Sequence, residues 1–200
     1  MIPTKRQISI IALLLSILMS GMSHASPDGF TLQHICLFDL RDLLPVRAFR
    51  MSASSMAPAL EKGDHLIARM KRYVDRLPGR GDVVIFPLRI DRSKDFIKRI
   101  IGLPGEAIQI KDKVVFINAQ RLDDPWGNRL DKRILPHDTS PRDNYGPVSI
   151  PEGSVFVMGD NRDLSLDSRF WGFIDIKDIR GKVLFIIWSD DWNRIGKEIR

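Results

Sequence analysis

Short apolar runs separated by turn residues limit the fold of this chain more than any other feature of its sequence. The runs that read as β-strands cover residues 66–68, 83–86, 96–103, 154–158 and 183–188. They are rich in Val, Ile and Phe, as strands usually are, and no helix-like apolar period of normal length follows residue 60. We therefore expect a mainly β domain over residues 51–190, built as a sandwich or a barrel with few short helices.

Two turn signals add detail to this β domain. Ile108 and Ile110, a turn at residues 111–113 and the run 114–117 predict a hairpin. Pro104 and Gly105 suit the two central positions of a type II turn. Residues 119–150 are rich in Asp, Arg, Pro and Asn, so we expect a variable β excursion from the core there.

The N-terminus carries an export signal. Lys5 and Arg6 precede an uncharged apolar stretch over residues 8–22, an order that leaves the N-terminus in the cytoplasm and exports the rest. The stretch approaches the roughly 20 residues that span a bilayer, so we expect residues 1–25 to form an apolar helix that anchors the chain. The alternative is a removable signal cleaved near Ala25, after a small-x-small motif.

The segments that flank the β domain are less distinctive. Residues 26–50 form a juxtamembrane segment that reads either as an amphipathic helix at the membrane interface or as a first core helix. Residues 191–200 read as a basic C-terminal tail. The net charge of +6 suits an anionic membrane or nucleic acid. The charge is spread along the chain and the export signal directs it out of the cytoplasm, so we expect no nucleic-acid partner.

Composition also argues against metal and disulfide chemistry. Cys36 is the single cysteine, which excludes an intrachain disulfide and a thiolate zinc site. The four histidines show no spacing typical of metal ligands. The aspartates near residue 160 do not match a 12-residue calcium loop, which ends in Glu. We expect no metal and no cofactor.

Three serines lie within four positions in MSASSMAPAL, residues 51–60. Serine is a weak nucleophile that needs a base within hydrogen-bond reach. No histidine is favoured as that base by its position, and the Gly-x-Ser-x-Gly elbow is absent. The segment is either a reactive turn or a plain linker.

A lysine is the other candidate base, provided that burial lowers its pKa from the usual value near 10.4. In DFIKRIIGLPGE a strand would place Lys98 on one face and Arg99 on the other, each among large apolar residues. Arginine stays charged in any such site, so only Lys98 qualifies as a base. The alternative is an edge strand whose cations reach water.

Residues 158–172, MGDNRDLSLDSRFWG, mix acidic and basic side chains densely. Internal ion pairs would make this segment a rigid loop, whereas a solvated surface loop is the alternative. Phe170 and Trp171 favour the first interpretation, since aromatic residues usually anchor a loop to a core.

Four blocks, in order, resemble the type I signal peptidases, which are membrane-bound serine proteases with a Ser-Lys dyad. The blocks are SSMAPAL, RGDVVIF, FIKRIIGLPGE and GDNRDLSLDSRFWGF, and the resemblance runs from about residue 49 to residue 188. It implies a fold of coiled antiparallel β-sheets with few short helices. Self-cleaving repressors use a similar dyad, but residues 1–50 offer no DNA-binding domain.

The resemblance also assigns roles to individual residues. It implies Ser55 as nucleophile, Lys98 as general base and Ser165 as the residue that orients the lysine. The residues that would hold the last block together are Asp160, Arg162, Asp167 and Arg169. The residues that would line the pocket for small substrate side chains are Met51, Ala53 and Ile97.

The sequence departs from the family pattern around the nucleophile. Ala53 stands where many members have a serine whose hydroxyl helps to bind the oxyanion, and others have glycine there. The backbone N–H of Ser55 would then carry more of that stabilisation, and one such donor is worth roughly 10²–10³ in rate. Ser54 and Ala59 replace the usual glycine and threonine.

The resemblance implies a monomeric enzyme that removes signal peptides from secretory preproteins after small residues. It would lie in the bacterial inner membrane as a single-pass protein that contacts lipid, with its catalytic domain on the outer, periplasmic side. Two alternatives stay open. One is a conjugative peptidase that processes pilin. The other, motivated by Ala53 and Ala59, is a non-catalytic, membrane-anchored relative that binds peptides.

Overall fold

The structure is a computed structural model that describes residues 46–70, 77–88 and 91–199. The expected anchor and most of the juxtamembrane segment lie outside the described residues. Apart from Val46, the described residues belong to one unit that begins at Arg47. Two β-sheets make up this unit, and all strand pairs whose register is defined are antiparallel. The mainly β class expected from the sequence is confirmed.

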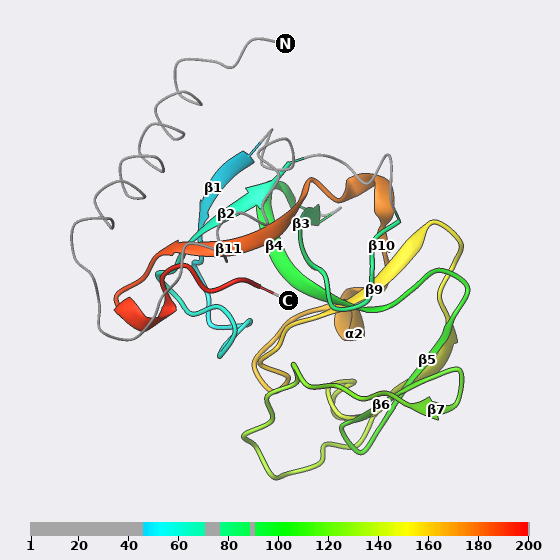
Figure 1. The fold of residues 1–200 in the computed structure, drawn as a ribbon. Helices are drawn as coiled ribbons and strands as arrows, with labels where there is room; N and C mark the ends of the chain where they lie inside the picture. Colours follow the sequence, from blue (N-terminus) through cyan, green and yellow to red (C-terminus); the bar gives the residue numbers. More distant parts are fainter. Residues whose placement is uncertain (1–45, 71–76, 89–90, 200) are drawn as a thin grey trace, which may run out of the picture. The chain divides into compact units, whose positions relative to one another are not determined.

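The larger sheet has seven strands in the order β1-β2-β11-β3-β4-β9-β10 (Figure 1). The strands are β1 Val46–Arg50, β2 His65–Arg69, β3 Val83–Leu88, β4 Asp91–Gly102, β9 Ser154–Met158, β10 Ile174–Asp175 and β11 Gly181–Trp188. The last strand in the sequence, β11, lies between β2 and β3 in the middle of the sheet. Strand β4 lies between β3 and β9, so it is an interior strand.

The smaller sheet has four strands in the order β7-β6-β5-β8, which are β5 Ala107–Lys111, β6 Val114–Ile117, β7 Gln120–Arg121 and β8 Tyr145–Ser149. Strands β5 and β6 form the expected hairpin. Its two turn residues, Asp112 and Lys113, have φ values of 49° and 69°, as a tight turn with a right-handed strand twist requires.

The expected Pro104-Gly105 turn is also present. Gly105 has a φ of 77° and the N–H of Glu106 donates to the carbonyl of Leu103 over 3.2 Å, which closes the turn.

Helical structure in the described residues is short. It consists of α2 Ser168–Trp171 and the 3₁₀ turns η4 Ile176–Asp178 and η5 Trp192–Arg194. None of the helices within the described ranges has the length and apolar character needed to cross a bilayer.

Apolar side chains from the sheets form three buried clusters. The first includes Met51, Met56, Leu60 and Ile97, and thus joins the segment after β1 to strand β4. The second and third lie around Phe86 and Phe156. The first cluster anchors residues on both sides of Ser55, the expected nucleophile.

Two segments differ from expectation. Val46–Arg50 forms strand β1, so a helix over the juxtamembrane segment does not include these residues. Near the C-terminus Ile199 is buried and its N–H donates to Leu184. The residues that read as a tail therefore pack along β11.

Candidate active site

The turn that carries Ser55 follows β1 and is fixed at both ends by backbone bonds and buried side chains. The N–H of Ala57 donates to Ser54 O over 3.2 Å, and the N–H of Leu60 donates to Met56 O over 2.9 Å. Met56 and Leu60 are fully buried and anchor the turn on the core. Ser55 itself stays partly exposed.

Lys98 lies in the interior strand β4 and points its amine at Ser55. Its side chain is buried, and Nζ donates to Ser55 Oγ over 2.6 Å. The edge-strand alternative is wrong, because β3 and β9 flank β4 and both Lys98 and Arg99 are buried. Residues 43 positions apart are thus brought within hydrogen-bond reach.

The environment of Lys98 disfavours its charge. Burial lowers the pKa of this lysine to about 8, although the nearby carboxylates of Asp167 and Asp160 oppose the shift and the Arg169 cation assists it. A useful fraction of the amine is therefore neutral slightly above neutral pH. A neutral amine this close to a hydroxyl can remove its proton.

The loop after β9 holds the serine turn from the other side. Asn161 makes two contacts with it: its backbone N–H donates to Ser55 O over 3.1 Å, and Nδ2 donates to Ser54 O over 3.3 Å. Gly159 passes so close that a Cβ at this position would collide with both Ser55 O and Ser165 Oγ. Only glycine allows this approach.

Ser165 is buried in the same loop, on the side of Gly159 that faces Ser55. Its hydroxyl has no hydrogen-bond partner among the described residues. It lies near enough to Asp167 to help lower the pKa of that carboxyl, without reaching hydrogen-bond geometry. The structure thus places Ser165 beside the candidate dyad but shows no bond from it to Lys98.

Asp167 and Arg169 form a buried ion pair within the loop, with two N–O distances of 2.8 Å. The N–H of Gly159 also donates to Asp167. Burial alone would raise the pKa of Asp167, but Arg169 and the Gly159 N–H outweigh it, so the pKa is lowered and the carboxylate stays ionised. Arg169 also donates to the carbonyl of Arg142, which ties the loop to the polar excursion.

Asp160 and Arg162 find partners outside the loop. Asp160 accepts from Arg99 over 2.8 and 2.7 Å, and Arg162 donates to Asp124 over 2.7 and 2.8 Å. The structure therefore shows internal ion pairs and excludes the solvated-loop alternative. Sequence reasoning missed both partners. The sequence did indicate that Arg99 needs a partner, since a buried cation in a strand needs a counter-ion. No sequence pattern marked Asp124 in the excursion as a partner.

The expected pocket residues separate into two groups. Met51 and Ile97 are buried in the same cluster as Met56, next to the serine turn. Ala53 is exposed on that turn. No described residue accepts a hydrogen bond from the Ser55 N–H, so this donor stays available.

Sequence analysis gave no role to Arg194, which supports the serine turn from η5. It donates to Pro58 O over 3.0 Å and to Ala59 O over 3.1 Å, and it pairs with buried Asp64 over 2.7 Å. Asp64 in turn accepts from the N–H of Glu61 at the end of the turn. In the sequence, only the cationic side chain of Arg194 could have indicated this role.

The described residues also include side chains that could act as metal ligands. Within the ranges described, no group of three or more His, Cys, Asp or Glu residues is placed to hold a metal ion.

Comparisons with known proteins show the family of this chain. The family described as signal peptidase, peptidase S26, matches residues 31–188. Signal peptidase I of Bacillus licheniformis is 36% identical over 161 residues, which cover 77% of this chain and 84% of that relative. Signal peptidase I of Bacillus caldolyticus is 32% identical over 158 residues, with 77% and 86% covered.

One further relative and one solved structure are also similar to this chain. Probable signal peptidase I-2 of Synechocystis sp. is 36% identical over 160 residues, which cover 74% of this chain and 69% of that relative. A solved structure of a signal peptidase I from Enterococcus faecalis has a TM-score of 0.42 and 29% identity, and covers 54% of this chain and 97% of that one.

A mainly β fold that brings a serine hydroxyl to a buried lysine is the setting of a serine endopeptidase, and the relatives agree with that class. The chain belongs to the signal peptidase family, peptidase S26.

Proposed function

We propose that this chain removes signal peptides from exported preproteins, with Ser55 as nucleophile and Lys98 as general base. The observation that carries the proposal is the 2.6 Å contact between Ser55 Oγ and Lys98 Nζ, on a lysine whose pKa is lowered by burial. The relatives of this chain are signal peptidases, which supports the substrate class.

The chemistry follows from the contact. Neutral Lys98 takes the proton of Ser55 as Oγ attacks the scissile carbonyl, and a tetrahedral intermediate forms. Lys98 then gives that proton to the leaving amine, and an acyl-enzyme remains on Ser55. Lys98 next takes a proton from a water that attacks the ester, and the proton returns to Ser55 Oγ as the acid product leaves.

Three neighbours would assist these steps. The unused Ser55 N–H would donate to the developing oxyanion. Ser165, buried beside the dyad without a partner, would orient Lys98 once substrate is bound. The ion pairs of Asp160, Arg162, Asp167 and Arg169 would keep the loop rigid around them.

Substrate specificity would come from small side chains next to the cut. The buried side chains of Met51 and Ile97 belong to the core cluster beside the turn and would leave little room for a large residue. Exposed Ala53 would contact the substrate backbone or a small side chain.

We place the enzyme in the bacterial inner membrane, anchored by residues 1–25, with its catalytic domain on the outer side. The basic-then-apolar order of the N-terminus supports this location. Its partners would be secretory preproteins and membrane lipid, and it would act as a monomer without metal or cofactor.

The test is cleavage of a purified preprotein by the full chain in detergent or liposomes. We expect Ser55→Ala and Lys98→Ala to abolish cleavage, while Lys111→Ala, which removes an exposed lysine of β5, leaves the rate unchanged. Cleavage by Ser55→Ala at the wild-type rate would contradict the proposal. Cleavage of a pilin precursor but of no generic preprotein would support the conjugative alternative.

A further inference from the structure

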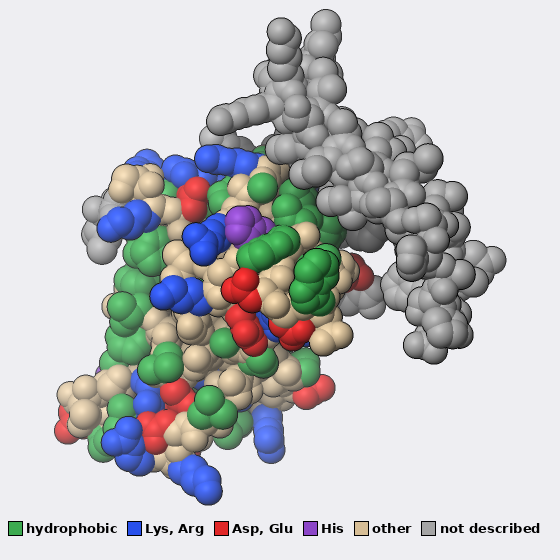
Figure 2. Space-filling view, turned by 90° about the vertical axis from the view of Figure 1, so that its left-hand side faces the viewer, with side chains coloured by type: hydrophobic (Ala, Val, Ile, Leu, Met, Phe, Trp, Pro, Cys, Tyr) green, Lys and Arg blue, Asp and Glu red, His purple; other side chains and the backbone are tan. Residues whose placement is uncertain are grey.

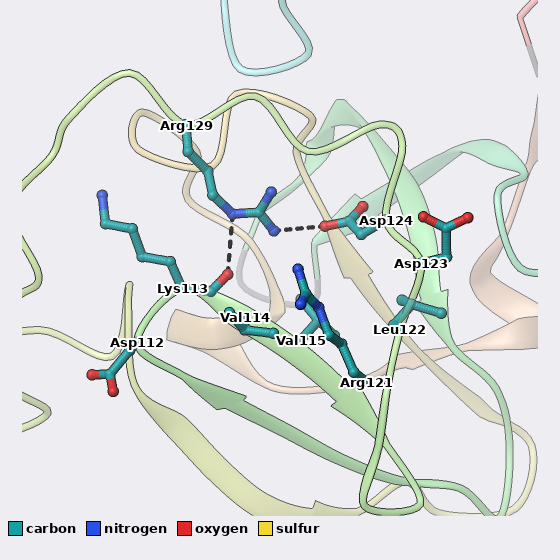
Figure 3. Close-up of a pocket in the computed structure, with 9 residues that line it drawn as sticks. All are labelled: Asp112, Lys113, Val114, Val115, Arg121, Leu122, Asp123, Asp124 and Arg129. Carbon is teal, nitrogen blue, oxygen red and sulfur yellow. Dashed lines mark hydrogen bonds and ion pairs between the residues drawn. The ribbon is translucent and has the colours of Figure 1, made fainter.

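A pocket of about 510 Å³ lies at the small sheet, whereas Lys98 lies on strand β4 of the larger sheet. Its walls are the β5–β6 turn, strand β7 and the start of the excursion that follows (Figure 3). The volume is within the range of small-ligand sites, roughly 300–1,000 Å³. Nothing in the proposed cleavage chemistry uses this pocket.

Two arginine side chains point into the pocket. Arg129 is held in place, because Nε donates to Lys113 O over 3.0 Å and Nη2 donates to Asp124 over 2.6 Å. Arg121 extends from β7 toward the Arg129 guanidinium (Figure 3). No described residue forms a hydrogen bond or ion pair with the guanidinium of Arg121, so its donors are available to a ligand.

The centre of the pocket has more positive than negative charge. The carboxylate of Asp124 is shared, since it accepts from Arg129 and also from buried Arg162. Burial lowers the pKa of Arg162; the Asp124 carboxylate opposes this shift, and the nearby Arg129 cation assists it. Asp124 therefore serves as counter-ion to both Arg129 and Arg162, whereas Arg121 has no acidic partner among the described residues. The other acids at the rim, Asp112 and Asp123, turn their carboxylates away from the centre (Figure 3).

The remaining lining is partly apolar. Val114 and Leu122 lie beside Arg121 at the floor of the pocket. A planar guanidinium matches a carboxylate with two parallel hydrogen bonds, and an aliphatic stem would cover the apolar floor. We propose that this pocket binds a carboxylate carried on a short aliphatic stem, either a glutamate side chain of a peptide or a small free acid, between Arg121 and Arg129.

The position of the pocket gives such a ligand a route to the active site. Arg162, which shares Asp124 with Arg129, also donates to Gly159 O over 3.0 Å. Gly159 is the residue that packs against the Ser55 carbonyl. A bound carboxylate would compete with Asp124 for Arg129 and leave Asp124 to Arg162.

The test is calorimetric titration of the full chain in detergent with glutarate and, separately, with a capped tetraglutamate peptide, at constant ionic strength. We expect saturable binding of at least one probe to the wild type. In Arg121→Gln the affinity should fall about tenfold or more, because a charge-assisted bond is lost. In Arg121→Lys the loss should be smaller, since the charge remains.

Arg133→Gln is the matched control, because Arg133 is an exposed arginine of the same excursion that does not line the pocket. It should bind the probes as the wild type does. Binding of glutarate alone would identify a small free acid as the ligand, and binding of the peptide alone would identify an acidic peptide. Equal affinities of the wild type and Arg121→Gln, or no saturable binding of either probe to the wild type, would overturn the proposal.

Discussion

At the scale of single residues, Lys98 is a cation that the fold keeps out of water. Burial lowers its pKa to about 8, and the carboxylates of Asp167 and Asp160 stop the shift from going further. The same burial that prepares the amine for proton transfer must destabilise the folded protein, because a charged amine loses its hydration. Activity and stability are therefore in opposition at this position.

The consequence for stability follows from linkage. The pKa of Lys98 is about 8 in the folded chain and 10.5 as a model value, so between these values the unfolded state binds more protons. The penalty is fully present below pH 8 and is relieved as the pH rises toward 10.5. We expect Lys98→Met to raise the free energy of unfolding at pH 7 by roughly 2–3 kcal/mol.

Urea unfolding of the wild type and Lys98→Met, compared at each pH, measures this effect. The advantage of the variant should shrink as the pH rises above 8. If Lys98→Met is less stable than the wild type at pH 7, burial of the charged Lys98 amine does not destabilise the fold, which would contradict this prediction. Lys111→Met, at an exposed lysine, is the control and should change little.

At the scale of elements, the serine turn is short and depends on its neighbours for its position. The loop after β9 holds its first half through Asn161, and η5 holds its second half through Arg194. The fork of Arg194 reaches two successive carbonyls, Pro58 O and Ala59 O, while it also pairs with Asp64. An ammonium group cannot reproduce this geometry.

We expect Arg194→Met to lower kcat by at least about tenfold, because misplacement of a nucleophile by a fraction of an ångström slows its attack. KM should change little, since the substrate contacts proposed for Met51 and Ile97 would be untouched. Arg194→Lys should recover only part of kcat.

Arg180→Met is the control for Arg194→Met, because it breaks an ion pair with Asp95 outside the serine turn. Both variants should be compared by kcat, KM and melting temperature. Equal losses of kcat in the two variants would mean that Arg194 has only a general structural role.

The sequence predicts features that depend on a local pattern, and it misses features that depend on contacts between distant residues. The strands β3 and β9 and the hairpin β5–β6 are visible because their apolar runs and turn residues are local. Strand β1 is half-exposed with two arginines, so its residues fit an amphipathic juxtamembrane helix as well as they fit a strand. The role of Arg194 depends on contacts 135 and 136 positions away, which no local pattern can show.

The site shows the same division. Ser55 and Lys98 follow from the family-like blocks, but their 2.6 Å contact depends on β4 being an interior strand, which alternation alone did not establish. The resemblance implied that Ser165 orients the lysine, and the structure shows Ser165 near the dyad without a hydrogen bond to Lys98.

At the scale of the whole described unit, one carboxylate in the excursion joins the small sheet to the loop after β9. Asp124 accepts from Arg162 of the loop and from Arg129 at the small sheet. Arg162 is buried, so removal of its counter-ion would leave an uncompensated charge. We expect Asp124→Asn to destabilise the fold by about 3–5 kcal/mol and to lower activity with it.

The neighbouring residue gives a close control. Asp123 is exposed, so Asp123→Asn removes the same charge one position away and should leave the melting temperature nearly unchanged. Thermal unfolding of the three proteins side by side measures the difference. A similar melting temperature for Asp124→Asn and Asp123→Asn would contradict the view that Asp124 links the two parts of the unit.

The central claim is that neutral Lys98 activates Ser55, and the pH dependence of Ser55 acylation under single-turnover conditions tests it most directly. The rate of acyl-enzyme formation should rise about tenfold per pH unit below an apparent pKa near 8 and then level off. Acylation should be absent in Ser55→Ala. A rate that stays flat across this range, or a wild-type rate in Lys98→Met, would contradict the claim.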